Sequence, residues 1–184
     1  MIDDSAYFFM LLHHNNLIQM IKNNETTVAG KQKTVIIKRA LNLPIDTVWK
    51  SWTDAEIFRK WWGPKDYTCP TCTIDFKVGG KNHSSMKGPD GKEIWSIGTF
   101  REIIPKKKIV YIDSFADKKG NIVSPAYYDM PGDWGRELKV TITLEDLGGK
   151  TKMHLEHEGI PREMYDDCVT GWQQSFDKLE NNLK

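Results

Sequence analysis

The chain has 184 residues, and its 26 lysines and arginines against 25 aspartates and glutamates leave a net charge of +1. This length favours one domain with a substantial core, and the balanced charge argues against a nucleic-acid binder, which usually carries a basic face. Three cysteines make a poor framework for disulfides, and no apolar run approaches the roughly 18 residues that span a bilayer. We therefore expect a cytoplasmic protein with no membrane span and no nucleic-acid partner.

Residues 1–32 are predicted to form an N-terminal helix and a linker ahead of a domain at residues 33–184. Apolar residues between positions 6 and 21 have helical spacing, whereas positions 23–32 have the composition of a linker. The helix could dock on the domain, pair with a second copy in a homodimer, or lie on a membrane surface. Docking or pairing is favoured, because the polar face carries histidine and asparagine rather than the lysine and arginine of membrane-surface helices.

The domain is expected to begin with a β-strand over residues 34–41, followed by two short helices. The first helix follows Pro44 and carries apolar residues at helical spacing. The second begins at Asp54, a favourable N-cap residue, and continues through Trp62 to the Gly-Pro pair that follows it.

Strands dominate the middle of the chain, and turns containing glycine separate them. Such turns join antiparallel neighbours. A last, long helix over residues 162–183 repeats apolar residues at spacings of three and four, the pattern of a helix that faces a sheet. This order predicts an α+β fold with one long helix lying across an antiparallel sheet. The expected strands cover residues 73–78, 82–87, 94–104, 108–115, 137–144 and 151–157.

For the strand over residues 94–104, the sequence does not decide which face points to the interior. Trp95 and Ile97 share one face, which suggests burial. Thr99 and Arg101 lie on the same face. This face either lines a partly hollow interior that contains polar groups, or points outward, and both interpretations stay open.

Several segments, in their order along the chain, resemble the activator of Hsp90 ATPase homologue 1-like (AHSA1-type) branch of the START/Bet v 1-like SRPBCC superfamily. The similarity covers residues 33–184 and implies a helix-grip fold. In this fold a curved antiparallel sheet of about six to seven strands surrounds the C-terminal helix and leaves a hydrophobic cavity between them. The segments are Leu43–Asp54, Trp61-Trp62-Gly63-Pro64, Asp75–Gly80, Gly98-Thr99-Phe100, Gly149-Lys150-Thr151, Gly171-Trp172 and Ser175–Leu179.

The resemblance implies binding of a small hydrophobic or aromatic molecule, since family members bind lipids, polyketides or other apolar compounds. Two alternatives stay open. One is a co-chaperone or protein-interaction module, although the co-chaperone that names the branch engages Hsp90 through an additional N-terminal domain and only about 32 residues precede this one. The other is a cavity-based enzyme of cyclase or hydrolase type, for which His157 and Asp113 are the acid/base candidates.

The loop over residues 116–135 is long and rich in aromatic residues, and loops of this length often have a function. It is expected either to close one end of the cavity or to pack on the sheet as a small additional core. The expected ligand-binding residues lie on the sheet, on the last helix and in this loop: Trp95, Ile97, Tyr111, Met153, Leu155, His157, Val169, Trp172, Phe176, Tyr128 and Trp134.

Cys69 and Cys72 form a CxxC motif that favours neither a redox site nor a metal site. A thioredoxin-type cysteine lies at a helix N-terminus, but a β-rich segment follows this motif. A structural zinc site needs about four ligands, and His154 and His157, three apart on one strand, point to opposite faces. We therefore expect no metal and no cofactor.

Overall fold

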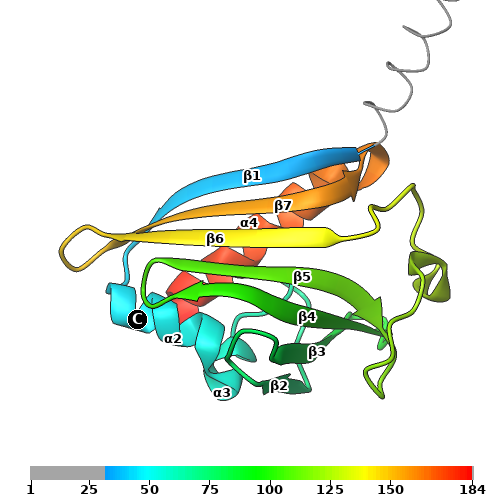
Figure 1. Ribbon diagram of the computed structural model, residues 1–184, viewed down its shortest axis with the longest axis horizontal. Coiled ribbons are helices and arrows are strands. Elements are labelled where there is room, and N and C mark those ends of the chain that lie inside the picture. The colour runs from blue at the N-terminus through cyan, green and yellow to red at the C-terminus, as the bar shows by residue number, and fades with distance from the viewer. Residues whose placement is uncertain (1–31, 184) are drawn as a thin grey trace, which may run out of the picture.

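The structure is a computed structural model that describes residues 32–183, so the predicted N-terminal helix lies outside the described residues. Within this range seven strands form one antiparallel sheet in the order β1-β7-β6-β5-β4-β3-β2 (Figure 1). The predicted α+β architecture is confirmed. The strands are β1 (Gln32–Leu41), β2 (Cys72–Ile74), β3 (Lys81–Lys87), β4 (Glu93–Ile104), β5 (Lys108–Ala116), β6 (Leu138–Asp146) and β7 (Thr151–Pro161).

Two short helices, α2 (Ile45–Thr53) and α3 (Ala55–Phe58), follow β1. Asp54 caps α3, and its carboxylate accepts hydrogen bonds from the next turn of backbone N–H groups. Helix α3 is shorter than expected, because the Lys60 N–H bonds the carbonyl of Ile57, three residues back, and the chain continues in tight turns. The short 3₁₀ helices η1 (Pro125–Tyr128) and η2 (Arg162–Met164) precede β6 and the last helix.

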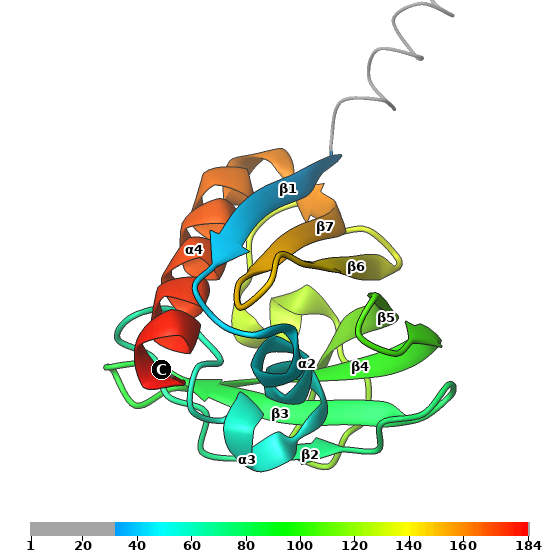
Figure 2. The same cartoon turned by 90° about the vertical axis from the view of Figure 1, so that its left-hand side faces the viewer.

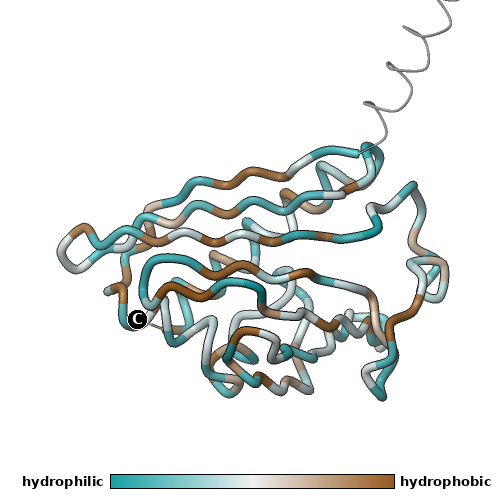
Figure 3. Tube along the Cα trace, in the orientation of Figure 1, coloured by the Kyte–Doolittle hydropathy of each residue, from teal (hydrophilic) through white to brown (hydrophobic). Residues whose placement is uncertain are grey.

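Helix α4 (Tyr165–Asn182) lies across the inner, concave face of the sheet, as Figure 2 shows. Trp172, Phe176 and Leu179 form its buried stripe. Along β1, β6 and β7 hydrophobic and hydrophilic residues alternate, which separates the covered face from the solvent face (Figure 3). The core therefore lies between α4 and the sheet, in the helix-grip arrangement.

Strand β2 has three residues where six were expected, because the chain turns away after Ile74. Gly80 makes this turn possible. A Cβ atom on Gly80 would lie 2.0 Å from the carbonyl oxygen of Asp75, so no larger residue fits there. The segment between β2 and β3 is consequently a tight connection rather than a continuation of the sheet.

The faces of β4 are decided by Gly98. A Cβ atom there would lie 2.9 Å from Cδ2 of Tyr111, which shows that Gly98 faces the inner side, under the tyrosine ring. Alternation along the strand then places Ser96 inside and Trp95 and Ile97 on the outer face. The structure thus corrects the expectation that Trp95 and Ile97 line a cavity beneath α4.

Trp95 and Ile97 are nevertheless buried, each with 6% exposure, because the connection between β5 and β6 covers them. The Tyr128 hydroxyl donates to the Ala116 carbonyl at 2.6 Å and accepts from the backbone N–H of Trp95 at 3.2 Å. The Trp95 ring also packs on His83, with centroids 4.9 Å apart. This part of the loop forms a small additional core outside the sheet, so Tyr128 does not cap the cavity.

Candidate functional site

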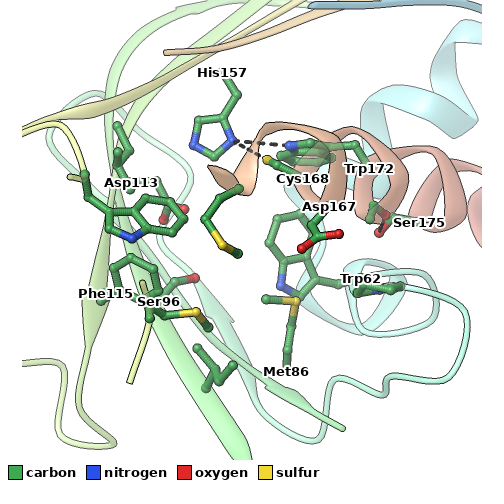
Figure 4. A pocket seen from close by; sticks show the side chains of 18 of the residues that line it. Trp62, Met86, Ser96, Asp113, Phe115, His157, Asp167, Cys168, Trp172 and Ser175 are labelled. Atoms are coloured by element: carbon green, nitrogen blue, oxygen red, sulfur yellow. Dashed lines mark hydrogen bonds between the residues drawn. The ribbon is translucent and has the colours of Figure 1, made fainter. Parts of the chain in front are cut away.

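A cavity of about 250 Å³ lies between α4 and strands β3 to β7 of the sheet (Figure 4). Its wall is mostly apolar and contains three tryptophans and three methionines. Two connecting segments complete it, one after α3 and one before β6. The lining residues are Trp62, Gly63, Pro64, Met86, Ile94, Ser96, Asp113, Ser114, Phe115, Met130, Trp134, Leu138, His157, Met164, Asp167, Cys168, Gly171, Trp172 and Ser175.

The structure brings together four of the residues singled out from the sequence: Asp113, Trp134, His157 and Trp172 all line the cavity. The other inner-face candidates are not among the lining residues. They pack in or against the hydrophobic core, where other side chains cover them. These residues are Tyr111, Met153, Leu155, Val169 and Phe176.

Sequence reasoning missed a large part of the wall, including Trp62, Met86, Ser96, Met130 and Cys168. Trp62 follows the turn at residues 59–61 and lies outside any helix, so helical periodicity could not indicate its direction. One signal in the sequence could have indicated the direction of Ser96. A glycine inside a strand often marks the close approach of another group. If Gly98 had been assigned to the inner face for this reason, alternation would have placed Ser96 on the same face.

His157 contributes the most distinctive polar group of the cavity. Its Nδ1 accepts a hydrogen bond from the indole N–H of Trp172 at 3.2 Å, and the Cys168 sulfur lies 3.9 Å from the same nitrogen (Figure 4). Burial lowers the pKa of His157 from 6.5 to about 4. The imidazole is therefore neutral near pH 7.

Asp113 is the second polar group, and it projects from the inner face of β5. Burial raises the pKa of its carboxyl from 3.8 to about 7, against the opposing effect of a backbone hydrogen bond at Ser114. Burial, with the nearby Asp113 charge, also raises the pKa of the Cys168 thiol to about 12. Near neutral pH the cavity thus holds a neutral imidazole, a protonated thiol and a carboxyl group that is partly ionised.

Comparison with known proteins identifies the family. Residues 42–184 match the family described as "Activator of Hsp90 ATPase homolog 1-like protein". The chain belongs to this family. The comparison with curated proteins found no match.

Solved structures of similar proteins share the fold of this AHSA1-type domain. A protein from Chromobacterium violaceum is 26% identical, with a TM-score of 0.67 over 82% of this chain and 96% of that one. A protein from Arthrobacter aurescens is also 26% identical, with a TM-score of 0.69 and coverages of 82% and 85%. The AHSA1 protein from Silicibacter pomeroyi is 19% identical, with a TM-score of 0.64 and coverages of 82% and 97%.

Lys178 of α4 holds one wall of the cavity of this AHSA1-type domain in place. Its ammonium group donates hydrogen bonds to the carbonyls of Tyr67 at 2.8 Å and of Gly63 at 3.0 Å. It also bonds the carbonyls of Trp62 and Pro64, each at 3.3 Å. Since residues 62–64 line the cavity, one half-buried cation fixes their backbone against α4.

The other connecting segment of the cavity wall, the one before β6, is also held in place by specific contacts. The Trp134 indole N–H donates to the carbonyl of Pro131 at 2.8 Å, and its ring packs edge-on against Phe115, with centroids 5.1 Å apart. The N–H of Gly135 donates to the carbonyl of Gly159 in β7 at 2.9 Å. These contacts hold Trp134 in the cavity wall, so the two halves of the long loop serve different faces of the sheet.

Cys69 and Cys72 lie outside this cavity, and neither forms a disulfide. A hydrogen bond from the Cys72 thiol lowers the pKa of Cys69, with help from the charges of Arg59 and Lys178, although burial opposes it. Cys72 is the first residue of strand β2 and does not begin a helix.

Within residues 32–183 no group of histidine, cysteine and carboxylate side chains could hold a metal ion. No helix in that range is long and apolar enough to cross a membrane.

Proposed function

We propose that this domain binds a small, largely apolar molecule in the cavity between the sheet and α4. The observation that carries the proposal is the cavity itself, whose wall is built from aromatic and sulfur-containing side chains with few polar groups. Ligand sites have this composition. At about 250 Å³ the space exceeds the about 150 Å³ of an apolar cavity that holds benzene, so a molecule of two fused rings is a reasonable size.

The contrast with the neighbouring core supports this function. Protein interiors are close-packed, and large voids are few. Next to the cavity, Trp61 lies 4.8 Å from Trp52 and 6.2 Å from Phe176 between ring centroids. A sequence that packs aromatic rings closely in one part of the core and leaves a hollow beside them provides a place for another molecule.

The first test is native mass spectrometry of the purified full chain, compared with the denatured chain. A co-purifying small molecule would be seen as added mass that denaturation releases. The second test is titration with naphthalene, followed by the indole N–H resonances in ¹H–¹⁵N NMR spectra. Trp62, Trp134 and Trp172 line the cavity, so their resonances should shift, whereas that of Trp49, outside it, should not.

Two substitutions in β4 provide a matched pair for this titration. Ser96→Phe adds a ring on the inner face, inside the cavity, and should weaken naphthalene binding at least tenfold. Thr99→Phe adds the same ring on the outer face, three residues further along, and should leave binding unchanged.

Wild-type affinity in a folded Ser96→Phe variant would refute the assignment of the cavity. Absence of naphthalene binding to the wild type, with no co-purifying molecule, would refute the binding function. The protein-interaction alternative would then be tested by assaying the ATPase activity of Hsp90 with and without the full chain.

A further inference from the structure

Asp113 brings a carboxyl group to the cavity without a basic side chain to pair with it. Its neighbours across the sheet on the inner face are Gly98 in β4 and Leu138 in β6, and neither has a polar side chain. Within residues 32–183 no lysine or arginine pairs with Asp113, and the hydrogen bond that it accepts comes from the backbone at Ser114. Carboxylates removed from bulk water are almost always paired. The carboxyl group of Asp113 therefore lacks a counter-charge that a ligand could provide.

This carboxyl group can be reached from the cavity. Asp113 is partly exposed and belongs to the lining, whereas burial in the protein raises its pKa to about 7, so the surface that it exposes is that of the cavity. Its oxygens are not among the fully buried side-chain atoms that lack a partner. Figure 4 shows Asp113 on the sheet side of the open space and Asp167 of α4 on the opposite side. A molecule in the cavity can thus contact Asp113 directly.

The lining of the cavity contains no positive charge. Two carboxyl groups, those of Asp113 and the exposed Asp167, belong to it, and no lysine or arginine does. The imidazole of His157 is neutral near pH 7, because burial lowers its pKa to about 4. Lys178 of α4 is bonded to backbone carbonyls and is not part of the lining. The carboxyl groups therefore determine the electrostatic potential in the cavity, which favours a cation over an anion.

The aromatic part of the wall favours the same sign of charge. A cation is attracted to the face of an aromatic ring, and most strongly to that of tryptophan. Trp62, Trp134 and Trp172 all line the cavity. A wall that combines these rings with an accessible carboxyl group suits an ammonium group that is attached to an apolar body. A hydrocarbon of the same size would fill the space and leave Asp113 without a partner.

We infer that the ligand is a cationic amphiphile, with an apolar body of the size proposed above and a protonated amine that pairs with the carboxylate of Asp113. The inference rests on the proposed binding function and specifies it. It excludes anionic molecules of the same shape as preferred ligands. A neutral molecule that hydrogen-bonds the protonated carboxyl group is the alternative, and the experiment below separates the two.

Pairing with Asp113 makes the affinity for a cation depend on pH. The cation binds the ionised carboxyl group, whose pKa is about 7 in the empty cavity, so its affinity should be about tenfold lower at pH 6 than at pH 8. The other titratable groups that face Asp113 do not reproduce this dependence. Burial raises the pKa of Tyr111 well above 10 and that of Cys168 to about 12, His157 is neutral at both pH values, and Asp167 is exposed.

Three probes of similar shape test the inference with the full chain, by isothermal titration calorimetry at about pH 6 and about pH 8. They are 2-naphthylmethylamine, which is protonated at both pH values, 2-naphthalenemethanol, in which a hydroxyl group replaces the ammonium group, and 2-naphthoate, which is anionic. At pH 8 the amine should bind at least tenfold more tightly than the alcohol, and the naphthoate should bind most weakly. At pH 6 the advantage of the amine should be about tenfold smaller, because most of Asp113 is then protonated.

Two substitutions of aspartate by asparagine locate the preference. Asp113→Asn keeps the shape of the cavity wall and removes its titratable charge, so it should abolish both the preference for the amine and the dependence on pH, while the affinity for the alcohol stays within about twofold of the wild type. Asp166→Asn is the matched control. Asp166 is exposed on α4, next to Asp167 in the sequence but outside the lining, so this variant should keep the preference of the wild type.

The possible results separate this inference from the proposed binding function. Equal affinities for the amine and the alcohol at pH 8, or a preference for the amine that survives in Asp113→Asn, would overturn the inference and leave the binding function intact. Tightest binding of the alcohol, which would indicate a neutral hydrogen-bonding ligand, or of the naphthoate would overturn it as well. Binding of neither naphthalene nor any of the three probes would overturn both proposals.

Discussion

Replacing Asp113 by asparagine should stabilise the domain by an amount that grows as the pH rises. Burial raises the pKa of this carboxyl from 3.8 to about 7 in the folded protein, so the folded state holds the proton more tightly than the unfolded state. The stability associated with the protonated carboxyl is fully present below pH 3.8 and is lost as the pH rises to about 7. Asparagine has no proton to lose and removes this dependence.

The size of the effect follows from the pKa. A tenfold change in proton affinity corresponds to about 1.4 kcal/mol, so a rise from 3.8 to about 7 corresponds to about 4 kcal/mol at high pH. Water in the cavity partly solvates the carboxylate and reduces this figure. We expect Asp113→Asn to differ little from the wild type near pH 4 and to be about 2–4 kcal/mol more stable near pH 8.

His157 acts in the opposite direction and makes the comparison sharper. Its pKa is lowered from 6.5 to about 4, so the stability that the neutral imidazole provides is present above pH 6.5 and is lost as the pH falls to about 4. In the wild type the two dependences nearly cancel between these values. In Asp113→Asn the dependence of His157 remains alone, so the free energy of unfolding of the variant should rise with pH over this range.

The assay is urea denaturation followed by circular dichroism, at constant ionic strength and in steps from about pH 4 to about pH 8. Asp167→Asn is the control, because this carboxylate also belongs to the cavity lining but is exposed. A difference between Asp113→Asn and the wild type that stays constant with pH would refute the reasoning, since it would reflect packing rather than proton binding.

Two further predictions concern the supports of the fold, and both are measured by urea denaturation. Lys178→Met should lower the free energy of unfolding by about 1.5–3 kcal/mol, the range for hydrogen bonds of a charged group, because four carbonyls lose one donor. Lys152→Met removes an exposed pair with Glu145 and should cost under about 0.5 kcal/mol; equal costs would contradict the role given to Lys178. Asp54→Ala should cost about 1 kcal/mol by removing the cap of α3, and an unchanged stability would show that α3 needs no cap.

The architecture could be predicted from the sequence because its largest elements repeat clearly. Strand β6 alternates apolar and polar residues over its length, and α4 carries one apolar stripe. Both patterns are local, and each corresponds to one geometry. The lengths of α3 and β2 were harder to predict from the sequence. They depend on the turn at Lys60 and on the close approach at Gly80, which are contacts between particular backbone atoms.

The site was less predictable than the fold, because much of its wall lies outside regular elements. Trp62 and Met130 reach the cavity from connecting segments, whose directions depend on distant contacts such as those of Lys178. The alternation of residues in β4 was also insufficient to identify its inner face. Both faces of this strand are covered, the inner by the core and the outer by the loop before β6, so a buried Trp95 does not reveal its side.

The polar residues of the cavity are the part of the structure that stability alone does not explain. An unpaired buried donor such as Nε2 of His157 costs about 1–3 kcal/mol, and the raised pKa of Asp113 is a further cost near neutral pH. Apolar side chains would remove both costs. Local departures from the rules of stable packing are expected at functional sites. Asp113 and His157 both line the one hollow space beneath α4, which supports the proposed binding function.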